Sequence, residues 1–346
     1  MQILALLALV ITLSLLYTYT NGFQDGSSVA AGPISCRALT RMQAVLLVTV
    51  CEFLGAIFGG SAVAYTIRSI TSWPDDPALL PVLANGLFAA ILWNYITKIL
   101  KVPSSSTHAL VGGIIGSIVA ATGSWKYIIW GDPDHILQST SIYKVVFSLF
   151  LSPLIGFFAG FICFFAVLLL LLRASSRANK GLKQMQWLTT AALAFGHGSN
   201  DTQKAMGVIV IALNASGVSA EHAIPLWVRL LVGTAMAFGI LSLVPGIVRR
   251  VGGIYKMRPI HGFVSELSSA AVVLLGSATG APVSASQIIA STVMGVGAAQ
   301  RRKGVHWLIA RDMLMAWFLT IPCSALLSAA SHALIFHWIS VAAFGR

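Results

Sequence analysis

The chain has 346 residues, of which 57% are hydrophobic and only 9% are charged, and its formal net charge is +12. Soluble domains carry about 25% charged residues, so this composition excludes an ordinary soluble protein. The basic residues lie in short connections between apolar runs and not on a basic helix interleaved with aromatics, which argues against a nucleic-acid partner and for an integral membrane protein.

Ten apolar segments are predicted, because each approaches the length of about 20 residues that spans a hydrocarbon core. The fifth and the last are long enough to tilt or to break, and Pro322 is predicted to cause such a break, so ten to twelve crossings are expected. The first segment has no basic residues before it and leads into a polar motif, so we interpret it as a span and not as a signal peptide. In chain order the segments are 2–20, 43–64, 78–100, 107–122, 143–172, 187–213, 224–245, 263–279, 283–298 and 308–340.

The orientation follows from the basic residues in the connections. Successive connections alternate between the two sides of the membrane. One side then holds fifteen Lys and Arg residues, Lys98 and Lys101 among them, and the other side holds five. Because cytoplasmic connections carry the excess of basic residues, both termini are predicted to lie outside. A multi-pass protein of the cell membrane is expected.

An internal repeat links the polar interruptions of the apolar segments. Asn21–Asp25 ends the first segment and His197–Asp201 interrupts the sixth, and Asp25 and Asp201 are 176 positions apart. The motifs that begin at Pro103 and Pro282 are 179 positions apart. Five segments separate the copies, so the second copy runs in the opposite direction. The sequence predicts an all-α membrane protein of two inverted repeats with broken or re-entrant helices, residues 1–172 and 187–346, joined by a basic cytoplasmic linker, 173–186.

Four of the ten carboxylates lie in or beside apolar segments: Asp25, Glu52, Asp201 and Glu266. A charged side chain at the bilayer centre costs at least about 2.5–3.5 kcal/mol, so these residues are predicted to face the protein interior. They are candidates for binding Na⁺ or H⁺, the alternative being buried polar residues capped by neighbouring amides. Lys204 follows Asp201 by three residues on one helical face, and pairing between them is favoured over a direct role in an anion site.

Hydroxyl clusters precede two glycine-rich helical runs. Ser104–Thr107 follows Pro103, and Ser284 and Ser286 follow Pro282. A helix start of this kind offers free N–H groups, a favourable dipole and side-chain donors, which are the elements of an oxyanion site. Ordinary N-capping is the alternative for a single cluster. Two clusters at matched places favour an anion site.

Enzymatic and ATP-driven functions are not expected. His108 and His197 adjoin the motifs, but an isolated histidine in an apolar chain is more often a hydrogen-bonded structural residue. The sequence contains no HExxH, GxSxG or Walker-type motif, and neighbouring positions such as Thr107 and His108 do not face each other on a helix. No cofactor is predicted, and no metal beyond Na⁺ at Asp25 and Asp201.

At these residues the chain resembles the inorganic phosphate transporter (Pit) family. Phe195–Gly207 is very close to the second signature of that family, and Pro103–Gly116 is similar to its serine- and threonine-rich loop and following helix. Asn21–Asp25 looks like a variant of the first signature, and Val283–Gly297 resembles the second loop. The resemblance covers nearly the whole chain.

The resemblance implies a helical, inverted-repeat transporter in the lipid membrane, often dimeric, that carries phosphate with Na⁺ or H⁺. Four positions depart from the family pattern: Gln24 replaces Asn or His, Ser28 replaces Asn, Ala285 replaces a hydroxyl residue and Gln287 replaces His. These differences remove ligands mostly from one half of the site. The resemblance gives as substrate candidates Ser105, Ser106, Thr107, Asn200, Gln203, Ser284 and Ser286, and as coupling-ion candidates Gln24, Asp25, Ser28 and Asp201, with Glu52, His108, Lys204, Glu266 and Gln287 in supporting positions.

The sequence therefore predicts a phosphate symporter that works by alternating access. A permease for another tetrahedral oxyanion such as sulfate and a passive anion channel remain as alternatives, because hydroxyl groups and helix dipoles do not distinguish them.

Overall fold

The computed structural model describes residues 1–100, 104–132, 141–173, 178–221, 223–242 and 245–344. Predicted features that fall on Lys101, on Pro103 and on residues 174–177 of the linker lie outside the described residues.

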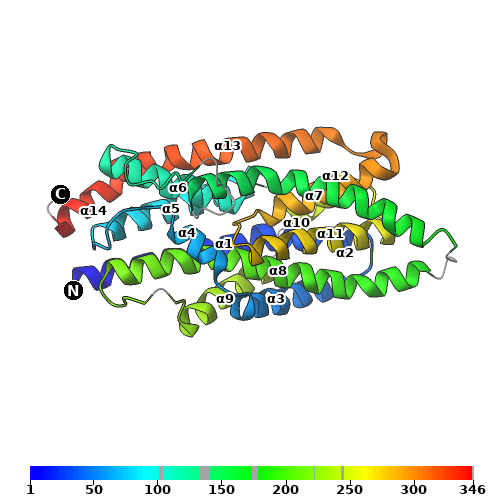
Figure 1. The fold of residues 1–346 in the computed structure, drawn as a ribbon, viewed down its shortest axis with the longest axis horizontal. Coiled ribbons are helices and arrows are strands. Elements are labelled where there is room, and N and C mark those ends of the chain that lie inside the picture. Colours follow the sequence, from blue (N-terminus) through cyan, green and yellow to red (C-terminus); the bar gives the residue numbers. More distant parts are fainter. Residues whose placement is uncertain (101–103, 133–140, 174–177, 222, 243–244, 345–346) are drawn as a thin grey trace.

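The described chain is an elongated bundle of helices that share one long axis (Figure 1). Each of the ten predicted apolar segments lies mainly in one of the longer helices. In chain order the helices are α1 Gln2–Val29, α2 Ala31–Ser35, α3 Arg41–Phe58, α4 Ala62–Arg68, α5 Leu79–Leu100, α6 Ser106–Thr122, α7 Ile142–Leu170, α8 Ala178–Ala215, α9 Leu226–Leu241, α10 Pro245–Gly253, α11 Pro259–Ala278, α12 Ala285–Arg301, a 3₁₀ turn Arg302–Gly304, α13 Trp307–Ser331, a π-helical turn His332–Phe336 and α14 His337–Phe344.

The bundle places apolar side chains outside and polar side chains inside. On α7, Phe158 and Ile162 are 58% and 64% exposed, whereas Asp25, Asp201 and Lys204 are at most 1% exposed. Among the described residues, six helices are long and apolar enough to cross a membrane. This distribution is stable in a lipid bilayer, because apolar side chains can contact the hydrocarbon there while polar groups stay inside the protein. The prediction of a multi-pass membrane protein is confirmed.

Two helical hairpins, α5–α6 and α11–α12, enter the bundle from opposite ends and meet at its centre (Figure 1). At the meeting point, the Ser286 hydroxyl donates to the Ser104 carbonyl at 3.4 Å, and the Thr107 hydroxyl donates to the Val283 carbonyl at 3.5 Å. The second helix of each hairpin begins at a hydroxyl cluster, as the sequence predicts, and re-entry of the hairpins into the membrane remains a prediction. Lys98 lies in the last turn of α5 and not in a connection, and its Nζ is 4.0 Å from the centre of the Phe23 ring.

Helix breaks occur elsewhere than expected. α1 and α8 continue through the two polar motifs, so Asn21–Asp25 does not end the first helix and His197–Asp201 does not interrupt the sixth. Polar side chains of both motifs make hydrogen bonds inside the bundle, which allows the helices to continue. α13 also continues through Pro322, which the packed bundle tolerates. The predicted segment 43–64 does break, before α4, at Gly60, whose φ of +88° suits glycine.

The helix ends at the two ends of the bundle can be compared with the predicted topology. α1 begins and α14 ends at one end, and α8 begins and α12 ends at the other (Figure 1), which agrees with the prediction that both termini lie on one side of the membrane. The described part of the predicted linker, from Ala178 onward, forms the first turns of α8.

Glycines let the central helices approach closely. A Cβ on Gly22 of α1 would lie 3.0 Å from the Cα of Gly239 of α9, and one on Gly198 of α8 would lie 2.5 Å from the Cα of Glu52 of α3. The packing is reciprocal: α1 packs on α9 as α8 packs on α3, and α6 packs on α13 as α12 packs on α7. This exchange of partners is compatible with an inverted repeat, which remains a prediction.

Gly198→Ala is expected to destabilise the protein, because a methyl group at this position meets the backbone of α3. Overpacking of this kind costs about 1–3 kcal/mol, so the thermal midpoint in detergent should fall by several degrees. Gly181→Ala in the same helix is the control, since nothing lies within 4 Å of its added Cβ. Equal midpoints for the two variants would contradict the close α3–α8 contact.

Candidate functional site

A buried polar cluster occupies the centre of the bundle, where α1, α3 and α8 meet the starts of α6 and α12. Its charged members are Asp25, Glu52, His197, Asp201 and Lys204, and each is 1% exposed or less. The sequence motifs bring these side chains together because α1 and α8 pass beside each other with their polar turns at the same depth.

Asp201 contacts three other side chains of the cluster. Its Oδ1 is 2.5 Å from Lys204 Nζ, as predicted from the spacing of three, and its Oδ2 accepts from Asn21 Nδ2 at 3.0 Å. His197 lies between two carboxylates, with Nε2 3.2 Å from Asp201 and Nδ1 2.7 Å from Glu52. The imidazole donates to both at once only when both of its nitrogens carry protons.

Asp25 connects α1 to the first hairpin. Its Oδ2 accepts a 2.5 Å hydrogen bond from the Ser106 hydroxyl, in the first turn of α6. The neighbouring Gln24 donates through Nε2 to the hydroxyl and the carbonyl of Ser104 at 2.8 and 3.1 Å. The first motif therefore holds the start of α6 in place.

Lys204 joins α8 to both hairpin tips. Besides Asp201, its ammonium donates to the Thr107 hydroxyl at 2.5 Å and to the Val283 carbonyl at 2.8 Å. The two hydroxyl clusters begin helices as expected, with Ser105 and Ser284 as the N-cap residues of α6 and α12. One cation and two helix N-termini thus converge on one point, an arrangement that favours a bound anion.

Several acceptor oxygens of the cluster have no hydrogen-bond donor within the described chain. Three of them follow one another along one turn of α1: Asn21 Oδ1, Gln24 Oε1 and Asp25 Oδ1. Buried acceptors without a donor are costly, and each requires an explanation such as a bound ion. Ligand atoms of Asp25, His197 and Asp201 also lie within 4.8 Å of one another, close enough to share a cation.

Other candidate residues line the edge of the cluster. Asn200 donates to the Ala281 carbonyl at 3.1 Å and so holds the second hairpin. Gln203 Oε1 accepts from the Val63 amide at 2.9 Å, and its Nε2 donates to the Gly59 carbonyl at 2.9 Å, which places this side chain across the α3–α4 break. Ser28 is buried one turn beyond Asp25, and its hydroxyl has no partner in the described part of the protein.

Glu266 is not part of the cluster. Its Oε2 accepts from the hydroxyls of Thr189 and Thr190 at 2.7 and 2.9 Å. Thr190 precedes Asp201 by eleven residues on the continuous α8, which corresponds to about 16 Å along the helix axis. Glu266 therefore forms a separate buried polar group between α8 and α11.

His108 and Gln287 face each other behind the two hydroxyl clusters. Nδ1 of His108 and Nε2 of Gln287 are 3.4 Å apart. Neither side chain is among the hydrogen-bond partners of Lys204.

Asn21 and His197 were not among the site residues predicted from the sequence. Each precedes the aspartate of its own motif by four residues, which is one helical turn, and each contacts Asp201. If both motifs are helical, the i, i+4 spacing places Asn21 beside Asp25 and His197 beside Asp201, because such positions share a face. The prediction of helix breaks at the motifs does not use this spacing.

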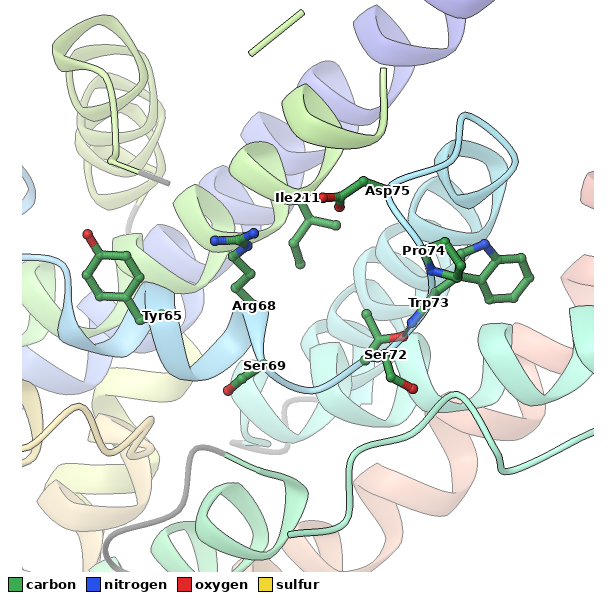
Figure 2. A pocket seen from close by; sticks show the side chains of 9 residues that line it. Tyr65, Arg68, Ser69, Ser72, Trp73, Pro74, Asp75 and Ile211 are labelled. Atoms are coloured by element: carbon green, nitrogen blue, oxygen red, sulfur yellow. Dashed lines mark hydrogen bonds between the residues drawn. The ribbon is translucent and has the colours of Figure 1, made fainter. Parts of the chain in front are cut away.

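A cavity of about 430 Å³ lies at the end of α4, outside the buried cluster (Figure 2). Arg68 of α4 and Asp75 of the following loop lie on either side of Ile211 of α8 in this view. α4 separates the cavity from the site, since its N-terminus is bound by Gln203 and its Thr66 hydroxyl donates to the Gly280 carbonyl at 2.7 Å.

Comparison with known proteins gives a consistent result. The family model of the "Phosphate transporter family" matches residues 21–328. The chain is 36% identical over 337 residues to a "Probable low-affinity inorganic phosphate transporter" of Bacillus subtilis (strain 168), covering 96% of this chain and 98% of that protein. A protein of the same description from Rhizobium meliloti (strain 1021) is 33% identical over 94% of this chain and 95% of its own length.

The fold is also that of a solved structure described as "The sodium-dependent phosphate transporter". The TM-score is 0.84 at 23% sequence identity, and the match covers 96% of this chain and 99% of the other.

Lys204→Ala is expected to cost about 3–5 kcal/mol of stability, because it leaves the Asp201 carboxylate buried without its main cationic partner. Adding Asp201→Asn should recover much of this loss, as measured by the thermal midpoint in detergent. Lys180→Ala, at an exposed position of the same helix, is the control and should change little. An equal midpoint for the single and double variants would show that the pair does not stabilise the site.

Proposed function

The chain belongs to the phosphate transporter family, and we propose that it is a cation-coupled symporter that carries inorganic phosphate by alternating access. It is a membrane transport protein and not an enzyme. The observation that carries the proposal is the row of acceptor oxygens on α1 that lack a donor, beside an anion-suited meeting point of two helix starts.

The charges of the cluster support coupling. Asp25, Glu52 and Asp201 supply three carboxylates, and Lys204 and a protonated His197 supply two positive charges. The remaining negative charge opposes an incoming anion, and two like charges 4 Å apart repel by about 4 kcal/mol at an effective dielectric constant of 20. A cation or proton that binds first removes this repulsion. Phosphate and cation then bind more strongly together than either does alone.

Phosphate binds between the two helix starts. The Ser106, Thr107, Ser284 and Ser286 hydroxyls, the N–H groups of the first turns of α6 and α12, and the Lys204 ammonium are its donors. The charged ammonium and the helix dipoles both favour an anion at this point. The Lys204 bond to the Val283 carbonyl, 2.8 Å long, is exchanged for a bond to phosphate oxygen.

Sodium is the preferred coupling ion. The three unpaired oxygens of Asn21, Gln24 and Asp25 belong to two amides and a carboxylate, which are ligands that suit a hard cation better than a proton alone. The structural neighbour is described as sodium-dependent, which favours the same ion. Asn21, Gln24 and Asp25 are its ligands, with the Ser28 hydroxyl one turn farther along α1.

Alternating access requires the hairpins to move. The helices of residues 1–172 and 187–346 interleave, since α6 packs on α13 and α7 packs on α12. Each hairpin therefore moves with the helix that packs against it, α5–α6 with α13 and α11–α12 with α7, instead of one half of the sequence rocking against the other. α4 covers the site on the side of the cavity in Figure 2, and phosphate enters past it.

Uptake of labelled phosphate into proteoliposomes tests the proposal. Under an imposed Na⁺ gradient, the protein is expected to accumulate phosphate above its equilibrium level, and an excess of sulfate is expected not to compete. Accumulation with an H⁺ gradient alone would replace sodium by protons as the coupling ion. Equal flux with and without gradients would identify a passive channel, and strong competition by sulfate would identify a permease for other oxyanions.

Asp25→Asn keeps an acceptor oxygen at the cation site but removes its charge. Cation-driven accumulation should fall by about tenfold or more, which corresponds to a loss of about 1.4 kcal/mol of cation binding. Glu221→Gln, at an exposed position, is the matched control and should accumulate phosphate normally. Undiminished accumulation by the Asp25 variant would exclude this carboxylate as a ligand of the coupling ion.

Ser286→Ala removes one hydroxyl donor from the start of α12. Because a hydrogen bond to a charged ligand contributes about 1.5–3 kcal/mol, the phosphate concentration for half-maximal uptake should rise by at least about tenfold. Ser291→Ala is the control on the same helix, since the Ser291 hydroxyl donates to the Gln287 carbonyl at 2.7 Å. The same half-saturation in both variants would place phosphate away from α12.

A further inference from the structure

A second cavity, of about 360 Å³, lies on a lipid-facing side of the bundle, next to the starts of α6 and α12. It lies between α7, α12 and α13, and aromatic and aliphatic side chains make up most of its wall. Leu154 and Phe318 at its outer edge are 57% and 61% exposed. In a membrane this opening faces hydrocarbon, so molecules dissolved in the bilayer reach it directly.

The buried end of the cavity carries two polar side chains, His108 and Gln287. His108 Nδ1 accepts from the Gln287 amide nitrogen at 3.4 Å, so the imidazole proton is on Nε2. Neither His108 Nε2 nor Gln287 Oε1 has a partner in the described chain, although the side chains are 0% and 1% exposed. The His108–Gln287 pair thus leaves one donor and one acceptor unpaired, and Trp317 Nε1 on the same wall is a further donor without a partner in the described chain.

This pair defines the chemistry of a ligand. A single O–H group satisfies both atoms once the two side chains turn towards the cavity, because its oxygen accepts from His108 Nε2–H and its hydrogen donates to Gln287 Oε1. The apolar wall takes a hydrocarbon chain, and it offers no counter-charge for an ionised head group among the described residues. We propose that this cavity binds an uncharged single-chain amphiphile of the bilayer, a fatty alcohol or a fatty acid in its acid form, with its O–H group between His108 and Gln287.

Such a ligand would act on transport, a consequence that rests on the proposed function. His108 directly follows Thr107 in α6, and Gln287 directly follows Ser286 in α12. A head group that bridges the two side chains ties the starts of both hairpins together from behind. Because the hairpins must separate during alternating access, occupancy slows phosphate uptake.

Photolabelling tests binding without any transport reaction. The protein in proteoliposomes is exposed to a long-chain alcohol that carries a diazirine on its chain, and the labelled peptides are identified by mass spectrometry. Label is expected on the parts of α7 and α13 that line the cavity. Unlabelled alcohol should suppress it about tenfold better than its methyl ether, because the ether lacks the donor for Gln287 and loses a hydrogen bond of about 1.4 kcal/mol.

Leu154→Trp is the variant that fills the cavity, and Leu188→Trp, at a 71% exposed position of α8, is the matched control. The first should lose the label and the second should keep it, while both bind phosphate. Three outcomes would overturn the proposal: label spread evenly over all lipid-facing helices, equal competition by alcohol and ether, or label that persists in Leu154→Trp. Each differs from a failure of phosphate symport, since none requires uptake to be measured.

Discussion

Uncompensated negative charge in a low-dielectric interior is the constraint on which the rest of this structure depends. Asp25, Glu52 and Asp201 lie within a bundle whose surface faces hydrocarbon, and their contacts are Asn21, Ser106, His197 and Lys204. Lys204 and His197 reduce the charge but do not cancel it. The same donors fix the geometry: Lys204 ties α8 to both hairpin tips, and Asp25 ties α1 to the start of α6. Because these bonds depend on the charge state of the cluster, the proposed cation would alter the position of the elements that would hold phosphate.

Close helix packing makes this cluster possible. α1, α3, α8 and α9 approach through glycines such as Gly22, Gly198 and Gly239, so short side chains on different helices reach one another. The interleaving of the two sequence halves follows from the same contacts. The packing also gives the motif residues different roles. Asp201 and Lys204 form the central ion pair, whereas Gln203 holds the α3–α4 break and Asn200 holds the second hairpin. α8 therefore connects the chemistry of the site to the elements that cover it.

Much of this arrangement can be predicted from the sequence. The apolar runs predict the main helices, and the hydroxyl clusters predict the helix starts at Ser106 and Ala285. The Asp201–Lys204 pair follows from helical spacing. The sequence does not reveal that α1 and α8 continue through their motifs, because glycine and polar residues signal a break unless tertiary partners satisfy them. It also does not separate Glu266 from Glu52: both are carboxylates in apolar segments, and only the packing of α11 on the early turns of α8 places Glu266 elsewhere.

The linkage between cation and phosphate is tested most directly by equilibrium binding. Labelled phosphate is bound to the purified protein in detergent at a fixed subsaturating concentration, while Na⁺ is raised at constant ionic strength and pH. Binding of phosphate should rise with Na⁺ in the native protein and stay nearly flat in Asp25→Asn, because the charge that the cation neutralises is then absent. Phosphate binding of equal strength with and without Na⁺, over a range of pH, would contradict the central role of the buried charge.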